Sequence, residues 1–107
     1  MARPTVFKLS VLLLKEGESW AAQVLEYDIA AQGKTIKLAS DALERTIVGQ
    51  IVLDATNGAV PLSDIPQAPK RYWDQFFKDA ERLDDRKSVR VPDEIPNRIV
   101  MEELRVC

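Results

Sequence analysis

The stretch YDIAAQGKT, residues 27–35, marks the point where the sequence changes from a strand pattern to a helix pattern. Before it, apolar and polar residues alternate; after it, apolar residues recur every three to four positions. Its last three residues, Gly-Lys-Thr, also close a nucleotide-binding P-loop, but that loop needs another glycine five residues before Gly33 so that its amides can surround a phosphate. Asp28 stands at that position. We therefore predict that Gly33 turns the chain and Thr35 caps a helix, without a bound nucleotide.

The residues before this stretch predict an antiparallel hairpin. Alternation runs through TVFKLSVLLL (residues 5–14) and again through WAAQVLEY (residues 20–27), with KEGES between them as a turn. The core-facing residues of the first strand are expected to be Phe7, Leu9, Val11 and Leu13. DIAAQ (residues 28–32) is short and apolar enough for a third strand, in which Ala30 and Ala31 suit the close approach of a helix or a partner chain.

The residues after Gly33 predict a long helix. Thr35 is a good N-cap by residue type, and Gly58 supplies a C-terminal stop, which gives a helix of roughly 20 residues. The apolar stripe of this helix consists of Ile36, Ala39, Leu43, Ile47 and Ile51. A later start, at Ser40 or Asp41 with Glu44 completing a capping box, remains an alternative.

The second half of the chain opens with a proline-rich connector and a second helix. Three prolines fall within residues 59–69, so this stretch is expected to run over the surface as a connector. Pro69 suits the first turn of a helix over residues 70–83. Four aromatic residues of this helix share a broad apolar face that is expected to pack on the sheet or on a second subunit, and they form the candidate interface: Tyr72, Trp73, Phe76 and Phe77.

The last residues are expected to form an arm and a strand. Residues 84–97 are polar and broken by prolines, which is typical of an extended arm, and RIVMEELRV (residues 98–106) can form a strand that pairs with its own sheet or with that of a neighbouring chain. The predicted fold is a single α+β domain over residues 1–107, with a C-terminal extension at 69–107. Its antiparallel sheet has three to four strands in the order β-β-β-α-α-β, with the long helix packed on the sheet.

Composition argues against several classes of function. The chain contains no histidine and one cysteine, Cys107, at its last position, so the usual general base and the commonest metal ligand are missing. Residues 70–90 carry seven basic and five acidic groups, an excess too small for direct binding of nucleic acid. No run of 18 apolar residues and no secretory signal is present, so we expect a cytoplasmic protein outside the membrane. We expect no cofactor and no catalysis.

The carboxylates leave one alternative open, in which the protein is an enzyme that uses carboxylates and a divalent metal. Each acidic pair lies in a predicted turn, in the arm or in the tail, where solvation explains it. A divalent-metal site would need at least three carboxylates that converge from rigid elements. Glu26, Asp28 and Asp54 are the only trio in the sequence that suits this alternative.

The order of hairpin, third strand, Gly-x-Thr and long helix resembles the HicB-type antitoxin domain, a partial ribonuclease H-like fold. The resemblance covers roughly residues 5–57, and its motif lies in SWAAQVLEYDIAAQGKTIKLASDALE, where Gly33, Thr35 and Ala39 match. Lys37 and Leu38 replace two acidic residues of the family motif, and its Gly-Cys pair is missing.

The resemblance implies a binding function for the chain. It implies a protein-binding module that sequesters a small, basic, RNA-cleaving toxin of the HicA type, usually as a dimer or a higher oligomer. The tail lacks the element order of the family's DNA-binding extensions, so operator binding is not expected. A self-associating structural or adaptor protein without a toxin partner is the alternative from another class.

Overall fold

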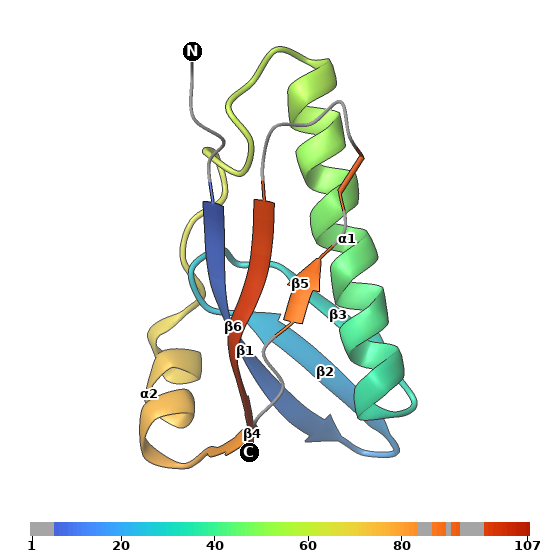
Figure 1. The fold of residues 1–107 in the computed structure, drawn as a ribbon. Coiled ribbons are helices and arrows are strands. Elements are labelled where there is room, and N and C mark those ends of the chain that lie inside the picture. The colour runs from blue at the N-terminus through green and yellow to red at the C-terminus, as the bar shows by residue number, and fades with distance from the viewer. Residues whose placement is uncertain (1–5, 84–86, 90, 93–97) are drawn as a thin grey trace.

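The computed structural model has an α+β fold, in which two helices pack on one mixed sheet (Figure 1). It describes residues 6–83, 87–89, 91–92 and 98–107. In chain order the elements are β1 (Val6–Glu16), β2 (Ser19–Val24), β3 (Ala30–Gly33), α1 (Ile36–Thr56), α2 (Lys70–Lys78), β4 (Glu81–Leu83), β5 (Lys87–Val89) and β6 (Arg98–Val106). Within the described residues the strand order is β3-β2-β1-β6-β4, and β5 also pairs with β6.

The C-terminal strand corrects the prediction of an antiparallel sheet. β6 pairs with β1 of its own chain, side by side and parallel, from Val6 opposite Arg98 to Leu13 opposite Val106 (Figure 1). Parallel neighbours need a long connection, which the helices and the short strands between β1 and β6 provide. The alternation of residues 98–106 predicts a strand but carries no information about its direction, which explains the error.

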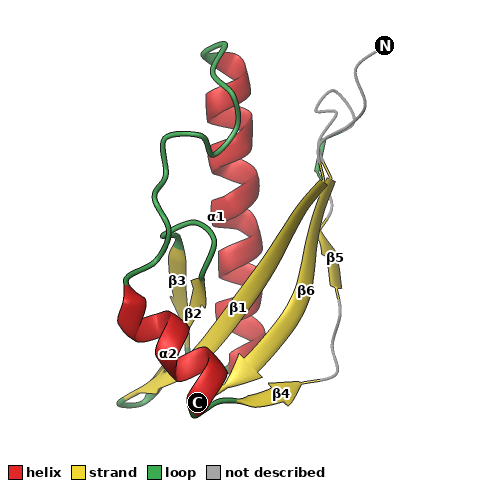
Figure 2. Ribbon diagram, turned by 90° about the vertical axis from the view of Figure 1, so that its left-hand side faces the viewer, coloured by secondary structure: helices red, strands yellow, loops and turns green. Residues whose placement is uncertain are grey.

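The sheet buries side chains on both faces. Alternate residues of β1 point to opposite faces, so Leu13 packs with α1 while Leu12 packs with α2. The four core-facing residues predicted for the first strand are buried, as is the α1 stripe from Ala39 to Ile51. α1 and α2 therefore lie on opposite faces of the sheet (Figure 2).

The long helix begins where its N-cap predicts. Thr35 has an extended backbone (φ −129°), and its Oγ1 accepts a hydrogen bond from the Leu38 amide at 3.1 Å. The helix covers 21 residues and is followed by Gly58 at φ +72°. The alternative start is wrong, because Ser40 lies inside α1 and is buried.

The second helix is shorter than predicted. α2 ends at Lys78, Pro69 is its N-cap instead of a first-turn residue, and residues 81–83 form β4 instead of a last turn. β4 pairs with the end of β6, where Leu83 lies opposite Leu104. This pairing gives hydrogen bonds to backbone groups on the edge of β6 that would otherwise be unpaired. Helical periodicity could not predict the pairing, because the two strands are far apart in the sequence.

Residues 87–89 of the predicted arm belong to the sheet, whereas residues 91–92 are irregular. β5 pairs with β6 from Ile99 to Met101, and Val89 is buried against α1. The rest of the predicted arm, at residues 84–86, 90 and 93–97, lies outside the described residues.

The proline-rich connector between α1 and α2 is irregular, as predicted, but it contributes to the core. Leu62 is 1% exposed and takes a left-handed backbone (φ +64°), which is unusual for a residue with a side chain. Its amide donates to Asp54 Oδ2 at 2.8 Å. This hydrogen bond and the burial of the leucine side chain offset the cost of the backbone conformation.

Candidate interaction surface

Gly33 is required by a close approach rather than by a turn. Its φ is not positive, in contrast to Gly17 and Gly58. A Cβ on Gly33 would lie 2.4 Å from the amide nitrogen of Ala39 and 2.6 Å from the carbonyl carbon of Leu38. Gly33 was predicted to turn the chain, but its role is steric. Only a residue without a Cβ lets β3 lie against the first turn of α1.

The Gly-Lys-Thr stretch has the contacts of a helix start. The Thr35 hydroxyl accepts from Leu38, and the Thr35 carbonyl accepts from the Ala39 amide at 2.9 Å. Two of the first amides of α1 are thus satisfied by Thr35 itself. This arrangement fits the predicted role of Thr35 as a cap.

The three carboxylates considered for a divalent-metal site each accept hydrogen bonds from a different part of the chain. Glu26 accepts from the Ser10 amide and from the Ser10 hydroxyl, both at 2.8 Å. Asp28 accepts from Gln23 Nε2 at 3.0 Å, and Asp54 accepts from the Leu62 amide. In the part of the chain that the structure describes, no group of three His, Cys, Asp or Glu residues is placed to hold a metal.

Glu26 is expected to contribute to stability. Glu26→Ala leaves two partly buried donors of Ser10 without their charged acceptor, so the free energy of unfolding should fall by about 1–3 kcal/mol. Urea unfolding measures this loss. Glu18→Ala, at the exposed hairpin turn, is the control, and an equal effect of the two changes would contradict the role assigned to Glu26.

The candidate interface on α2 divides between core and surface. Phe76 is fully buried between α2 and the sheet, whereas Phe77 is 63% exposed. Tyr72 and Trp73 are half-buried. The rings of Trp73 and Phe77 stack with their centroids 6.3 Å apart, so these two residues form the accessible aromatic surface of α2.

An arginine from the distant C-terminal strand completes this aromatic cluster. The guanidinium of Arg105 lies 4.5 Å from the ring centroid of Phe76 and 5.5 Å from that of Phe77. Its Nη1 donates to the Phe76 carbonyl oxygen at 2.9 Å, and its Nε donates to Glu103. Sequence reasoning missed Arg105 because it lies 29 residues from Phe76.

Charged groups on the exposed side of α2 pair within the helix. Lys70 Nζ lies 2.7 Å from Asp74 Oδ2, and this hydrogen bond holds the pKa of Asp74 below its usual value. Arg71 donates to the Tyr72 hydroxyl, which raises the pKa of Arg71. Both pairs lie at the surface, where the Lys70 side chain is 84% exposed and that of Asp74 is 40% exposed, so they contribute little to the stability of the fold.

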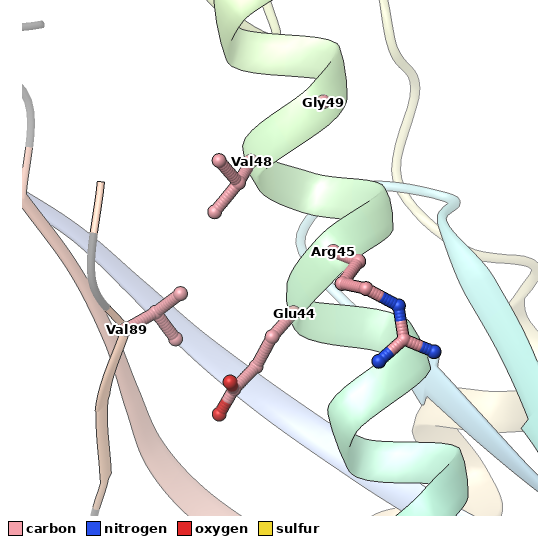
Figure 3. A pocket seen from close by; sticks show the side chains of 5 residues that line it. All are labelled: Glu44, Arg45, Val48, Gly49 and Val89. Atoms are coloured by element: carbon pink, nitrogen blue, oxygen red, sulfur yellow. The ribbon is translucent and has the colours of Figure 1, made fainter. Parts of the chain in front are cut away.

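A groove of about 380 Å³ separates α1 from β5 (Figure 3). Val48 and Val89 point toward each other across it, Glu44 extends toward the β5 side, and Arg45 points away. Its size falls within the range of small-molecule sites, but its lining is apolar apart from Glu44 and Arg45. Sequence reasoning did not identify the groove, because β5 was assigned to the arm.

Neither protein-family models nor curated proteins nor solved structures give a match to the chain. Function must therefore be argued from the chain's own residues. Neither of the described helices combines the length and apolar character that crossing a membrane requires.

Large apolar side chains that remain exposed are dispersed over several elements. They are Val6, Leu38, Leu53, Val60 and Phe77. Phe77 belongs to the aromatic surface of α2, and Leu38 lies beside Gly33 at the start of α1. The described surface thus offers apolar side chains for contact with other proteins, while Glu26, Asp28 and Asp54 each accept hydrogen bonds within the fold.

Proposed function

We propose that the chain is a non-catalytic protein-binding module, similar to a stand-alone HicB-type antitoxin that sequesters a small basic toxin of the HicA type. The observation that carries the proposal is the junction of β3 and α1. The residues that resemble the family motif are the ones that shape this junction: Gly33 admits the helix, Thr35 caps it, and Ala39 is buried at the contact.

The arrangement of the helices supports a module without its own DNA-binding unit. A helix-turn-helix needs two helices joined by a short turn. α1 and α2 lie on opposite faces of the sheet and are connected by residues 57–69 (Figure 2). The net charge of −2 is compatible with a basic protein as partner.

The proposal also covers the location of the protein and its self-association. The protein acts in the cytoplasm, where its single cysteine needs no partner. It also forms a homo-oligomer, and self-association without a toxin partner is the second candidate function. This second candidate is favoured by the edge strand β3, which within the described residues pairs with β2 alone.

The proposal is tested by retrieval of the partner and by co-expression. The tagged protein should retrieve a small basic protein from its native cell, and a short adjacent reading frame should encode a basic protein with one histidine. Expression of that protein alone should arrest growth, and co-expression should restore it. Failure to restore growth, together with retrieval of no small basic protein, would leave self-association as the function.

The aromatic surface of α2 gives this proposal a residue-level test. Phe77→Ser removes an exposed aromatic anchor and should weaken binding of the retrieved partner by about tenfold or more, as measured by titration calorimetry. Val60→Ser is the matched control, because Val60 is 71% exposed on the connector. Equal affinities of the two variants would exclude the α2 surface as the contact.

A further inference from the structure

The sheet has a hollow on the face that carries α2. Its volume is about 360 Å³, which is within the range of small-molecule sites. Residues that lie opposite each other on paired strands share a face, so two rows form the floor. One row contains Leu14, Ala21 and Gln32, the next contains Gln23 and Ala30, and Tyr72 of α2 lines the side. The two alanines leave the space open, because their side chains are too small to fill it.

Gln23 supplies the hollow with an unused hydrogen-bond acceptor. Gln23 is 5% exposed, and its Nε2 donates to the Val24 carbonyl oxygen and to Asp28 Oδ1, both at 3.0 Å. Because these neighbours are all acceptors, the amide nitrogen must face them and the amide oxygen must point away. The amide oxygen accepts no hydrogen bond from the described residues, and it is not enclosed. It is therefore available to a donor in the hollow that Gln23 lines.

The other polar side chains of the floor also present acceptors. Gln32 Nε2 donates to Glu16 Oε2 at 3.1 Å, which leaves the Gln32 amide oxygen and the second oxygen of Glu16 for a ligand. No lysine or arginine is among the described residues that line the hollow. Arg71 lies over the Tyr72 ring beside the hollow, but it is exposed, donates to the Tyr72 hydroxyl and interacts with Asp28. The hollow thus suits a ligand that donates hydrogen bonds and carries positive charge.

The acceptors lie at two ends of an apolar floor. Gln23 and Gln32 are diagonal neighbours on paired strands, and such positions are about 7–8 Å apart. Ala21 and Ala30 complete the same two rows, and Leu14 flanks them. A ligand that uses both ends needs a donor at each end and an apolar chain of about this length between them.

We propose that this hollow binds a small aliphatic diamine. One ammonium group donates to the Gln23 amide oxygen, the other donates to Glu16 and Gln32, and the methylene chain covers the two alanines. Two carboxylates favour ammonium over a neutral donor such as an alcohol: Asp28 bonds to the Gln23 amide at one end, and Glu16 lies at the other. This binding site is separate from the aromatic surface of α2 that is proposed for a protein partner.

The first test is a titration of the isotope-labelled protein with cadaverine, followed by nuclear magnetic resonance. The backbone amide signals of Ala21, Gln23, Ala30 and Gln32 should shift and saturate, with a Kd of about 1 mM or below. The control ligand is n-pentylamine, which has the same chain and one ammonium group, and it should bind about tenfold more weakly or worse.

Two outcomes of this titration would overturn the proposal. The absence of saturable shifts at these residues would exclude the site. Equal binding of n-pentylamine would show that one ammonium group is enough, as on a lysine side chain of a partner protein, and would exclude the diamine.

A charge variant tests the outer end of the hollow. Glu16→Gln removes the negative charge there, so it should weaken cadaverine by about fivefold or more. Glu18→Gln is the matched control, because Glu18 is exposed in the same hairpin and does not line the hollow. Equal weakening by the two variants would mean a general attraction to an acidic surface and would overturn the site.

A filling variant tests the position of the ligand. Ala30→Leu extends a side chain over the floor and should abolish the shifts caused by cadaverine, whereas Ala59→Leu, on the exposed connector, should leave them unchanged. Thermal unfolding checks that Ala30→Leu is folded. If it is not, the comparison of Glu16→Gln with Glu18→Gln decides the question alone. Unchanged binding by a folded Ala30→Leu variant would overturn the proposed position.

These measurements use the isolated chain, so they do not depend on the antitoxin function. Binding of cadaverine by a chain that retrieves no small basic protein would support the diamine site and contradict the antitoxin proposal. Retrieval of such a protein by a chain that does not bind cadaverine would do the reverse.

Discussion

Phe76→Ala is expected to lower the free energy of unfolding by about 3–5 kcal/mol. Phe76 is 0% exposed, and it packs with Leu12 and Leu25 in the cluster between α2 and the sheet. Its removal leaves a cavity there and takes away one of the two rings on which Arg105 rests. Urea unfolding, followed by tryptophan fluorescence, measures the loss.

The adjacent residue provides the control for this prediction. Phe77→Ala removes the same atoms from a side chain that is 63% exposed, so it should cost less than about 1 kcal/mol in spite of its contacts with Trp73 and Arg105. Similar losses for the two variants would mean that α2 does not pack on the sheet through Phe76.

Gly33→Ala is expected to cost about 3 kcal/mol or more, at the upper end of overpacking effects. The added Cβ would meet the backbone of α1 at 2.4 Å, and a backbone cannot rotate away as the end of a flexible side chain can. Relief requires β3 and the first turn of α1 to separate. Thermal unfolding should show the loss directly.

A second glycine provides the matched control. Gly49 lies inside α1, and nothing lies within 4 Å of the position of a Cβ there. Gly49→Ala should therefore stabilise the protein by about 0.5–1 kcal/mol, because alanine loses less conformational freedom in a helix than glycine does. If Gly33→Ala were equally harmless, the close approach of β3 and α1 would be wrong.

Local signals in the sequence predict the first half of the fold well. Alternation in β1 and β2 specifies which residues face α1, and Thr35 starts the long helix through a side-chain hydrogen bond to a residue three positions away. Each of these signals acts between residues that are close in the chain or that share one face.

The second half depends on contacts between distant residues, which local patterns do not contain. α2 ends before residues 81–83, which pair with β6, and β6 runs parallel to β1. Helical spacing put Phe76 and Phe77 on one broad apolar face, but only the position of the sheet separates them into a core residue and a surface residue. The sequence singled out Gly33 as a glycine that precedes a helix. Its steric role could not be predicted, because that role depends on how closely α1 approaches β3.

The proposed partner contact lies on the α2 face of the sheet. It uses Trp73 and Phe77 on α2, which packs on the opposite face from α1. Each subunit thus presents one aromatic surface. Saturation at one partner per subunit is the stoichiometry that this arrangement predicts.

The position of β6 has a consequence for folding during synthesis on the ribosome. β6 lies in the interior of the sheet, yet it is translated after every other described element. Until β6 emerges from the exit tunnel, the backbone N–H and C=O groups on one edge of β1 have no partner strand. The nascent hairpin also exposes the apolar residues that β6 will cover. A late, long-range pairing of this kind slows folding and makes the unfinished chain a natural client for chaperones.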